Sequence, residues 1–503
     1  MPFRYVSASL LTRTLSRQAS IRRLSDQVLL KIFRYYLDAS PRFWPRLVHI
    51  CRRWRLIVFA SRGALPIRLI CTHGVPVSRT LDLWPTMSID VHYGGPQEHD
   101  PLTPEDEENV MDALVRPHRV RSINLTITSS LLEKLSSIGW KFPELENLVL
   151  MSRHSVRQAL PLAFERTSHL RCLHLTGFTA PDVLQHLLSS RNIVDLQLHD
   201  VLDPRRVSPE ALTNALSEMS QLRSLSLHFL STDVYLASHS STVGLVLLPV
   251  ISRLEFRGSS AFLDNLIAYI DAPRLGDIEV TYFPELWHQS HNLVNFIKRI
   301  NMHDSHRRAD ILSSEDTISV TLTQPGASTC LKLQLLCKPL SDQLTFITRI
   351  CKYFSGFKVE DLRINTTQPS SKESRCSWAG FIGPFKSVKW FHAAGHMMEL
   401  VQDLPKLNEH SGARSDRPKE GFHQSGLPDL QKLYVQQPGP RHAPLSAPIV
   451  SFMVSRWRSG CPIAVEYEQP CHMDESLGAG TWYSQCQNEY FLTRVKWDLS
   501  LSR

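Results

Sequence analysis

A short apolar pattern recurs along the middle of the sequence and restricts the fold more than any other feature. Seven segments have the order apolar-x-x-apolar-x-apolar, and their last apolar residues are Leu125, Leu150, Leu175, Leu198, Leu227, Phe256 and Val280. Successive members of this series lie 25, 25, 23, 29, 29 and 24 residues apart. A regular period of this size indicates one structural unit repeated along the chain, because a single unit cannot bury its own apolar face.

Most periods also contain a helix pattern. Apolar residues at helical spacing occupy residues 131–138, 183–188, 212–219, 262–270 and 293–300. Ser208 precedes Pro209 and Glu210, an order that favours the start of the third of these helices. Strand–helix units of this kind stack, so the pattern predicts an α/β solenoid with a parallel strand layer on its concave face and helices outside.

The period is that of leucine-rich repeats, whose units are about 20 to 29 residues long. The Asn or Cys that usually follows the strand in such repeats is absent here, so the segments are leucine-rich-repeat-like. Further strand patterns at 359–364, 388–391, 430–435 and 463–467, and helix patterns at 341–354, 396–404 and 446–457, extend the solenoid over residues 117–470. The weaker period near 301–340 predicts an insertion with strands at 318–322 and 331–335, and the polar stretch 408–426 predicts a disordered loop.

A different pattern precedes the repeats, in residues 24–59. Apolar residues at helical spacing predict two short amphipathic helices joined by a proline-containing turn, with Ser25 able to cap the first helix. A unit of roughly 40 residues rarely holds a core alone. The stretch is therefore either the first helical pair of a larger core or a docking module that keeps an apolar face for another protein.

The residues of this stretch resemble the F-box motif. The resemblance rests on Leu24, Asp26, Val28-Leu29, Ile32-Phe33, Leu47-Val48 and Cys51-Arg-Arg-Trp-Arg55, with Ser25 where F-boxes usually have proline. Together with the repeats that follow, this order is similar to that of F-box leucine-rich-repeat proteins. The resemblance implies that the helices bind the Skp adaptor of a Skp–cullin–F-box ubiquitin ligase, and through it the cullin. The residues expected to bind the adaptor or to hold the helices in place are Leu24, Val28, Leu29, Ile32, Phe33, Leu47, Val48 and Trp54.

The sequence thus predicts five parts. They are a basic disordered extension at 1–20, the F-box-like module at 21–62, a connector at 63–116, the solenoid at 117–470 and a tail at 471–503. The arginine- and serine-rich residues 1–23 would also suit a mitochondrial transit peptide. However, import would separate an F-box from its partners, so cytoplasm or nucleus is the expected location.

Composition and motifs exclude several other classes. The ten cysteines include no CxxC pair, and the net charge of +8 comes from dispersed lysines and arginines, so neither a disulfide framework nor nucleic-acid binding is indicated. The longest apolar run is too short to span a membrane. No nucleotide loop, nucleophile elbow or HExxH motif is present, and no cofactor is expected. The pairs His288/His291 and His303/His306 are too incomplete to predict a metal site.

The polar positions of the repeat strands are the candidate substrate-binding residues. Strand alternation turns them away from the buried face and onto the concave surface, where solenoids commonly bind partners. Four residues with polar, hydrogen-bonding side chains stand out there: His174, His199, His228 and Arg257. The expected function is therefore recruitment of an unidentified protein substrate for ubiquitination and degradation, without chemistry by this chain. The alternative is an interaction scaffold that does not assemble a ligase.

Overall fold

The computed structural model describes part of the chain. The described residues are 21–39, 44–61, 65, 67–74, 77–93, 102–138, 141–152, 169–178, 191–201, 208–229, 244–283, 291–300, 307–324, 330–337, 340–353, 358–367, 382, 385–395, 427–436, 447–458 and 460–468. The chain divides into two compact units, Met1–Met151 and Ser152–Arg503. The fold is mixed α/β with a large and mostly parallel sheet, as the sequence predicts.

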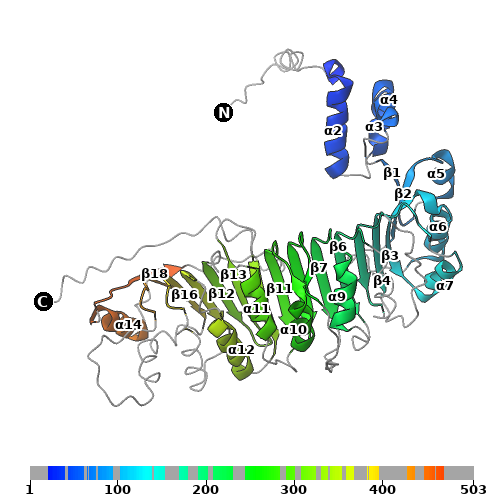
Figure 1. Ribbon diagram of the computed structural model, residues 1–503. Helices are drawn as coiled ribbons and strands as arrows, with labels where there is room; N and C mark the ends of the chain where they lie inside the picture. The colour runs from blue at the N-terminus through cyan, green and yellow to red at the C-terminus, as the bar shows by residue number, and fades with distance from the viewer. Residues whose placement is uncertain are drawn as a thin grey trace, which may run out of the picture. The chain divides into compact units, whose positions relative to one another are not determined.

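The first unit begins with three helices after a short 3-10 turn, η1 (Ile21–Arg23). They are α2 (Asp26–Ala39), α3 (Trp44–Ile50) and α4 (Arg52–Ala60), shown in blue in Figure 1. Ser25 lies at the start of α2, where its hydroxyl oxygen accepts a hydrogen bond from the Val28 amide at 3.4 Å. Asp26 occupies the first turn, where the helix dipole favours an acidic side chain.

The prediction of a single second helix in this stretch was wrong. Cys51 adopts an extended conformation, with φ −159° and ψ 167°, and separates α3 from α4. The side chain of Arg55 stabilises this break, because its Nε donates to the carbonyl oxygen of Val48 at 2.9 Å, near the end of α3. Neither glycine nor proline marks the break, so the local sequence carries no sign of it.

The rest of the first unit alternates strands and helices. In chain order these are β1 (Arg68–Cys71), α5 (Ser78–Leu83), β2 (Ser88–Tyr93), α6 (Pro104–Leu114), η3 (Pro117–Arg119), β3 (Val120–Ile127), α7 (Ser129–Ile138) and β4 (Asn147–Ser152). The first three strands pair in parallel in chain order. Thr103 and Asp106 form a capping box that fixes the start of α6. The predicted connector 63–116 therefore contains regular secondary structure of its own.

The second unit contains most of the repeat strands. They are β5 (Cys172–Thr176), β6 (Asp195–Val201), β7 (Ser224–Phe229), β9 (Arg253–Gly258), β11 (Asp277–Tyr282), β12 (Arg308–Ser313), β13 (Thr317–Thr323), β14 (Cys330–Leu336), β15 (Asp361–Thr366), β16 (Trp390–Gly395), β17 (Lys432–Gln436) and β18 (Ala464–Glu468). The sheet order is β5-β6-β7-β9-β11-β14-β13-β12-β15-β16-β17-β18, and Figure 1 shows these strands as neighbouring arrows. A separate parallel pair joins β8 (Val246–Leu247) to β10 (Ile270–Asp271).

The apolar positions of the repeat lie opposite one another in this sheet. Leu225 pairs with Leu196 and with Leu254, and the next apolar position, Leu227, pairs with Phe256. All of these side chains are buried. The repeat pattern therefore sets the register, because a shift by one residue would move the apolar side chains to the opposite face.

Helices connect many of these strands. They are α9 (Pro209–Ser217), α10 (Ser260–Ala268), α11 (His291–Arg299), α12 (Leu340–Tyr353) and α14 (Ala447–Arg458). Ser208 caps α9 as predicted, and its hydroxyl accepts a hydrogen bond from the Ala211 amide at 2.9 Å. The helix α10 packs against α9 and α11, so each of these helices covers its neighbour.

The insertion interrupts the parallel order. Strand β13 is antiparallel to both β12 and β14, while β14 pairs in parallel with β11 and β12 pairs in parallel with β15. The two predicted strands of the insertion correspond to β13 and β14, and the structure adds β12. The prediction of a wholly parallel layer is therefore wrong at β13 alone among the described strands of this sheet.

Several predictions fall outside the described residues. These are the extension 1–20, the helices at 183–188 and 396–404, the loop 408–426 and the tail 471–503. Within the described part of the chain, every helix is too short or too polar to cross a membrane.

Candidate functional site

The first candidate surface lies on α2, whose side chains divide into three faces. The inner stripe is buried and consists of Leu29, Phe33 and Leu37. The outer stripe is exposed and consists of Val28, Ile32, Tyr35 and Tyr36. Gln27, Lys31, Arg34 and Asp38 are also exposed, and at 3.6 residues per turn they share the third, polar face. Two of the three faces of α2 are therefore apolar, and only one of them is buried.

The inner stripe holds the three helices together. The ring of Phe33 lies 4.7 Å from that of Trp54 on α4, centroid to centroid, and Phe33 has no exposed surface. The Arg53 guanidinium donates to the Asp26 carboxylate and to the carbonyl oxygen of Leu24, which ties α4 to the start of α2. Leu47 and Val48 on α3 are also buried. These contacts fix the arrangement that presents the outer stripe.

The eight predicted adaptor-binding residues therefore divide into groups. Leu29, Phe33, Leu47 and Val48 are buried, Leu24 and Trp54 are half-buried, and Val28 and Ile32 are exposed by 42% and 46%. Tyr35 is not among the eight predicted residues, although it is 78% exposed and lies on the outer stripe. The spacing of 28, 32 and 35 along a helix would have indicated it.

The second candidate surface is the polar face of the sheet in the second unit. Strand pairing aligns one row of side chains across it: His174, Gln197, Ser226, Glu255, Glu279 and Lys332. His199, His228 and Arg257 lie two residues further along their strands, on the same face. The four predicted substrate-binding residues thus come from the neighbouring strands β5, β6, β7 and β9.

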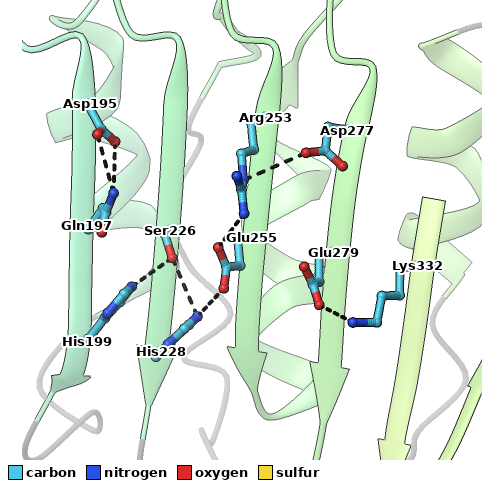
Figure 2. Close-up of polar contacts among 10 residues, drawn as sticks. All are labelled: Asp195, Gln197, His199, Ser226, His228, Arg253, Glu255, Asp277, Glu279 and Lys332. Atoms are coloured by element: carbon cyan, nitrogen blue, oxygen red, sulfur yellow. Dashed lines mark hydrogen bonds and ion pairs between the residues drawn. The ribbon is translucent and has the colours of Figure 1, made fainter. Parts of the chain in front are cut away.

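Three of these residues take part in hydrogen bonds with other side chains of the sheet, and Figure 2 shows two of them, His199 and His228. The Nε2 atom of His199 lies 2.8 Å from the Ser226 hydroxyl, and the Nε2 atom of His228 lies 3.4 Å from the same hydroxyl and 3.0 Å from Oε1 of Glu255. The two imidazole rings are stacked, with centroids 3.9 Å apart and planes 6° apart. Separately, the Nε2 atom of His174 lies 2.9 Å from the Asp195 carboxylate.

Charged residues continue this arrangement across the next strands. Arg253 donates to Glu255 at 3.2 Å and lies 3.7 Å from Asp277, and Lys332 donates to Glu279 (Figure 2). Glu255 and Glu279 lie opposite each other in the register of β9 and β11, but each carboxylate pairs with a basic or imidazole side chain, so most charges on this part of the face have a partner. Ser226 and Glu255 could not be recognised as partners of His199 and His228 from the sequence, because each contact joins residues that lie 27 positions apart on neighbouring strands.

Arg257 differs from the three histidines. Its side chain is exposed, and its guanidinium carbon lies 5.8 Å from the centroid of the Phe283 ring. Among the described residues, Arg257 forms no ion pair. It therefore offers a permanent positive charge on this face, where the neighbouring histidines are engaged with side chains of the same sheet.

The histidine network does not have the geometry of a nucleophile relay. In such a relay the histidine uses one ring nitrogen for the nucleophile and the other for the carboxylate. Here the same Nε2 atom of His228 contacts both Ser226 and Glu255, and Ser226 is buried. Among the described residues, no group of three or more His, Cys, Asp or Glu side chains is placed to hold a metal ion. His288, His303 and His306 lie outside those residues, as does the side chain of His291.

The network shifts the pKa values of two of its members. The hydrogen bond from His228 is the main cause that lowers the pKa of Glu255 to about 2, so Glu255 is ionised. Burial, together with the neighbouring His228, lowers the pKa of His199 to about 4, so His199 is neutral near pH 7. Because neutral imidazole can accept a hydrogen bond, the Ser226 hydroxyl can donate to His199.

These shifts predict that acid destabilises the second unit in two steps. Between pH 6.5 and about 4 the unfolded chain protonates His199 while the folded chain does not, so the free energy of unfolding falls as the pH falls. Glu255 adds a second loss as the pH falls from 4.5 to about 2. Urea unfolding midpoints of wild type and His199→Asn between pH 7 and 4 test the first step. The unfolding midpoint of the variant should change less with pH than that of wild type. An equal change in the two proteins would contradict the assignment of the first step to His199.

No protein-family model matches this sequence, and no curated protein matches it. Its function is therefore inferred from its own residues and from their arrangement.

Proposed function

We propose that this protein is a substrate-recognition subunit of a Skp–cullin–F-box ubiquitin ligase. In this proposal the helices α2, α3 and α4 form an F-box that binds the Skp adaptor, and the second unit is a leucine-rich-repeat-like solenoid that binds the substrate. The observation that carries the proposal is the exposed outer stripe of α2, which lies beside a buried inner stripe that already holds the helices together.

The exposed stripe favours a protein partner over an ordinary solvated helix face. Val28, Ile32, Tyr35 and Tyr36 are large apolar or aromatic side chains that recur on one side of a single helix. Single exposed apolar residues need no explanation, but a contiguous stripe of them is typical of a helix that binds a partner. The polar third face of α2 would remain in water when the stripe is covered.

The polar face of the second unit suits substrate recognition. A row of fixed acidic and basic groups can discriminate partners by charge pattern, because a wrongly placed like charge costs binding energy. The exposed Arg257 supports an acidic group in the substrate at that point. The chain itself would make and break no bonds, and it would act by raising the local concentration of a substrate lysine near the ubiquitin-conjugating enzyme.

A pull-down with the purified Skp adaptor tests the proposal. We expect wild type to bind and Val28→Asp/Ile32→Asp to lose about 100-fold or more in affinity, because two carboxylates would be forced into an apolar interface. The matched control is Gln27→Asp/Lys31→Gln, which also lowers the net charge by two but changes the polar face of the same helix. This control should bind like wild type.

Phe33 is unsuitable for this test, because its side chain is fully buried and a charge there would unfold the helices. Circular dichroism should show equal helix content in all three proteins. If folded wild type does not bind the adaptor, the ligase proposal is wrong, and an interaction scaffold without ligase assembly becomes the better explanation. Equal loss of binding in both variants would show that charge, and not the outer stripe, decides the result.

A further inference from the structure

Ser25 ends a basic sequence pattern at the start of α2. It follows Arg22, Arg23 and Leu24, so arginines occupy the positions three and two residues before its hydroxyl group. Basophilic protein kinases select serines with arginines at these two positions, because carboxylates of the kinase pair with the guanidinium groups. Neither adaptor binding nor substrate binding requires this pattern, and it therefore indicates a further role for Ser25.

The structure leaves Ser25 accessible to such an enzyme. The side chains of Arg23 and Ser25 are exposed. Within the described residues, the Ser25 hydroxyl has one hydrogen bond, which it accepts from the Val28 amide at 3.4 Å. Just before it, the Leu24 amide donates to the carbonyl oxygen of Ile21 at 3.2 Å. Because few backbone bonds hold this end of the helix, it can open locally into the extended form that a kinase groove binds.

Position 25 is also in line with the outer stripe of α2. At 3.6 residues per turn, Ser25, Val28, Ile32 and Tyr35 follow one another along one side of the helix, at i, i+3, i+7 and i+10. The last three side chains are exposed. A phosphate on Ser25 would therefore add roughly 1.5 to 2 negative charges at one end of the surface that the adaptor is proposed to cover.

The surroundings of Ser25 would keep this charge in water without unfolding the helix. Asp26 is acidic itself, and the Arg53 guanidinium already donates to the Asp26 carboxylate and to the carbonyl oxygen of Leu24. Even when Arg23 pairs with it, a phosphate group stays strongly hydrated, so covering it with an apolar surface is unfavourable. The helix dipole favours an anion at this terminus, so the phosphate opposes docking and not folding.

We propose that a basophilic protein kinase phosphorylates Ser25 and that the phosphate weakens binding of the adaptor to α2. In the reaction, the Oγ atom of Ser25 attacks the γ-phosphorus of ATP. The Oγ–P bond forms, the bond from the γ-phosphorus to the bridging oxygen breaks, ADP leaves, and the kinase takes the hydroxyl proton. The effect on docking rests on the proposed function, whereas the modification itself does not depend on it.

Mass spectrometry of the full chain tests the modification, after incubation with ATP and cyclic-AMP-dependent protein kinase as the basophilic probe. We expect phosphate on Ser25. Ser16 and Ser20 each have one arginine three residues before them but none two residues before them. Phosphate on these serines and not on Ser25 would overturn the proposal, and so would a chain that remains unmodified.

Two matched variants separate recognition of the arginines from a general effect of charge. Arg22→Gln/Arg23→Gln should lower the rate of phosphate transfer to Ser25 by about tenfold or more, because the kinase loses two charged contacts. Lys31→Gln/Arg34→Gln removes the same charge from the polar face of α2, where both side chains are exposed, and should leave the rate unchanged. An equal fall in both variants would overturn the assigned recognition.

The affinity for the purified adaptor, measured before and after phosphorylation, tests the effect on docking. The phosphorylated chain should bind about tenfold more weakly or worse, with equal helix content by circular dichroism. Ser25→Asn keeps an N-cap acceptor but has no hydroxyl, so treatment with kinase and ATP should not change the affinity of this variant. An equal loss in Ser25→Asn would place the effect at another residue and overturn the assignment.

The two parts of the inference fail in different ways. Unchanged affinity of the phosphorylated wild-type chain would overturn the effect on docking while the modification stands. If the unphosphorylated chain does not bind the adaptor, the proposed function is wrong and the effect on docking falls with it. The mass spectrum decides the modification of Ser25 in either case.

Discussion

Replacing Arg119 with methionine is expected to destabilise the first unit by about 3–5 kcal/mol. The Arg119 side chain is buried and donates to three carbonyl oxygens: from Nε to Met87 at 2.8 Å, from Nη1 to Leu81 at 3.4 Å and from Nη2 to Trp84 at 2.5 Å. Leu81 and Trp84 lie at the end of α5, where helix carbonyls have no partner within the helix. Methionine has a similar length but no donor, so the carbonyl oxygens of Leu81 and Met87 would lose the buried donor that Arg119 provides, whereas the Trp84 carbonyl would keep the hydrogen bond from the Met87 amide at 3.3 Å.

Arg121→Met is the matched control, two residues along the same chain. The Arg121 guanidinium is more than a third exposed and pairs with Glu146 at 2.6 Å, and Glu146 keeps a second partner in Arg68 at 2.8 Å. Such a partly exposed pair contributes about 1 kcal/mol or less. Two measurements compare the variants: the free energy of unfolding of the full chain in urea, and the hydrogen-exchange rates of the amides in β2 and β3. Equal losses in the two variants would show that the three carbonyl contacts of Arg119 do not decide stability.

The second large effect is expected for Phe33→Ala, at about 3–5 kcal/mol. Phe33 is fully buried and its ring contacts that of Trp54, so its removal leaves a cavity between α2 and α4. Tyr35→Ala, on the same helix, removes an aromatic ring that is 78% exposed and should change stability by no more than about 0.5 kcal/mol. Thermal unfolding, monitored by the fluorescence of Trp54 and the other tryptophans, measures the loss of stability in both variants. A smaller loss of stability for Phe33→Ala than for Tyr35→Ala would contradict the assignment of Phe33 to the buried inner stripe and of Tyr35 to the exposed outer stripe.

The two substitutions on α2 also separate stability from docking. Tyr35→Ala should leave the helices folded and weaken adaptor binding, if the outer stripe is the docking surface. Phe33→Ala should weaken binding only as far as it unfolds the helices, so binding should recover at lower temperature, where more of the chain is folded.

Much of the repeat architecture follows from the sequence, and the physical reason is periodicity. Because side chains alternate between the two faces of a strand, the positions of Leu225 and Leu227 fix which residues are buried, and the same positions in the next unit, Leu254 and Phe256, lie opposite them. The strand alternation also placed His174, His199, His228 and Arg257 on one face correctly. Their assignment to substrate binding stays a prediction.

Other features depended on contacts between residues far apart in the sequence. The break between α3 and α4 has no glycine or proline, and the Arg55 contact to the Val48 carbonyl that stabilises it could not be inferred from propensity. The period around residues 308–336 did not show that β13 would run antiparallel between β12 and β14. The pairing of His228 with Glu255, which lowers the pKa of that carboxyl group, required the register of β7 against β9.

For this protein, the sequence by itself determined the α/β class, the repeated strands and the face that each strand buries, because these follow from local periodicity and from the need of each unit to cover its neighbour. The tertiary structure alone decided which apolar residues of α2 are inside. Val28 and Leu29 are adjacent and equally apolar, yet only Leu29 is buried, because the positions of α3 and α4 determine which stripe is covered. The candidate docking surface is the stripe that this packing leaves exposed.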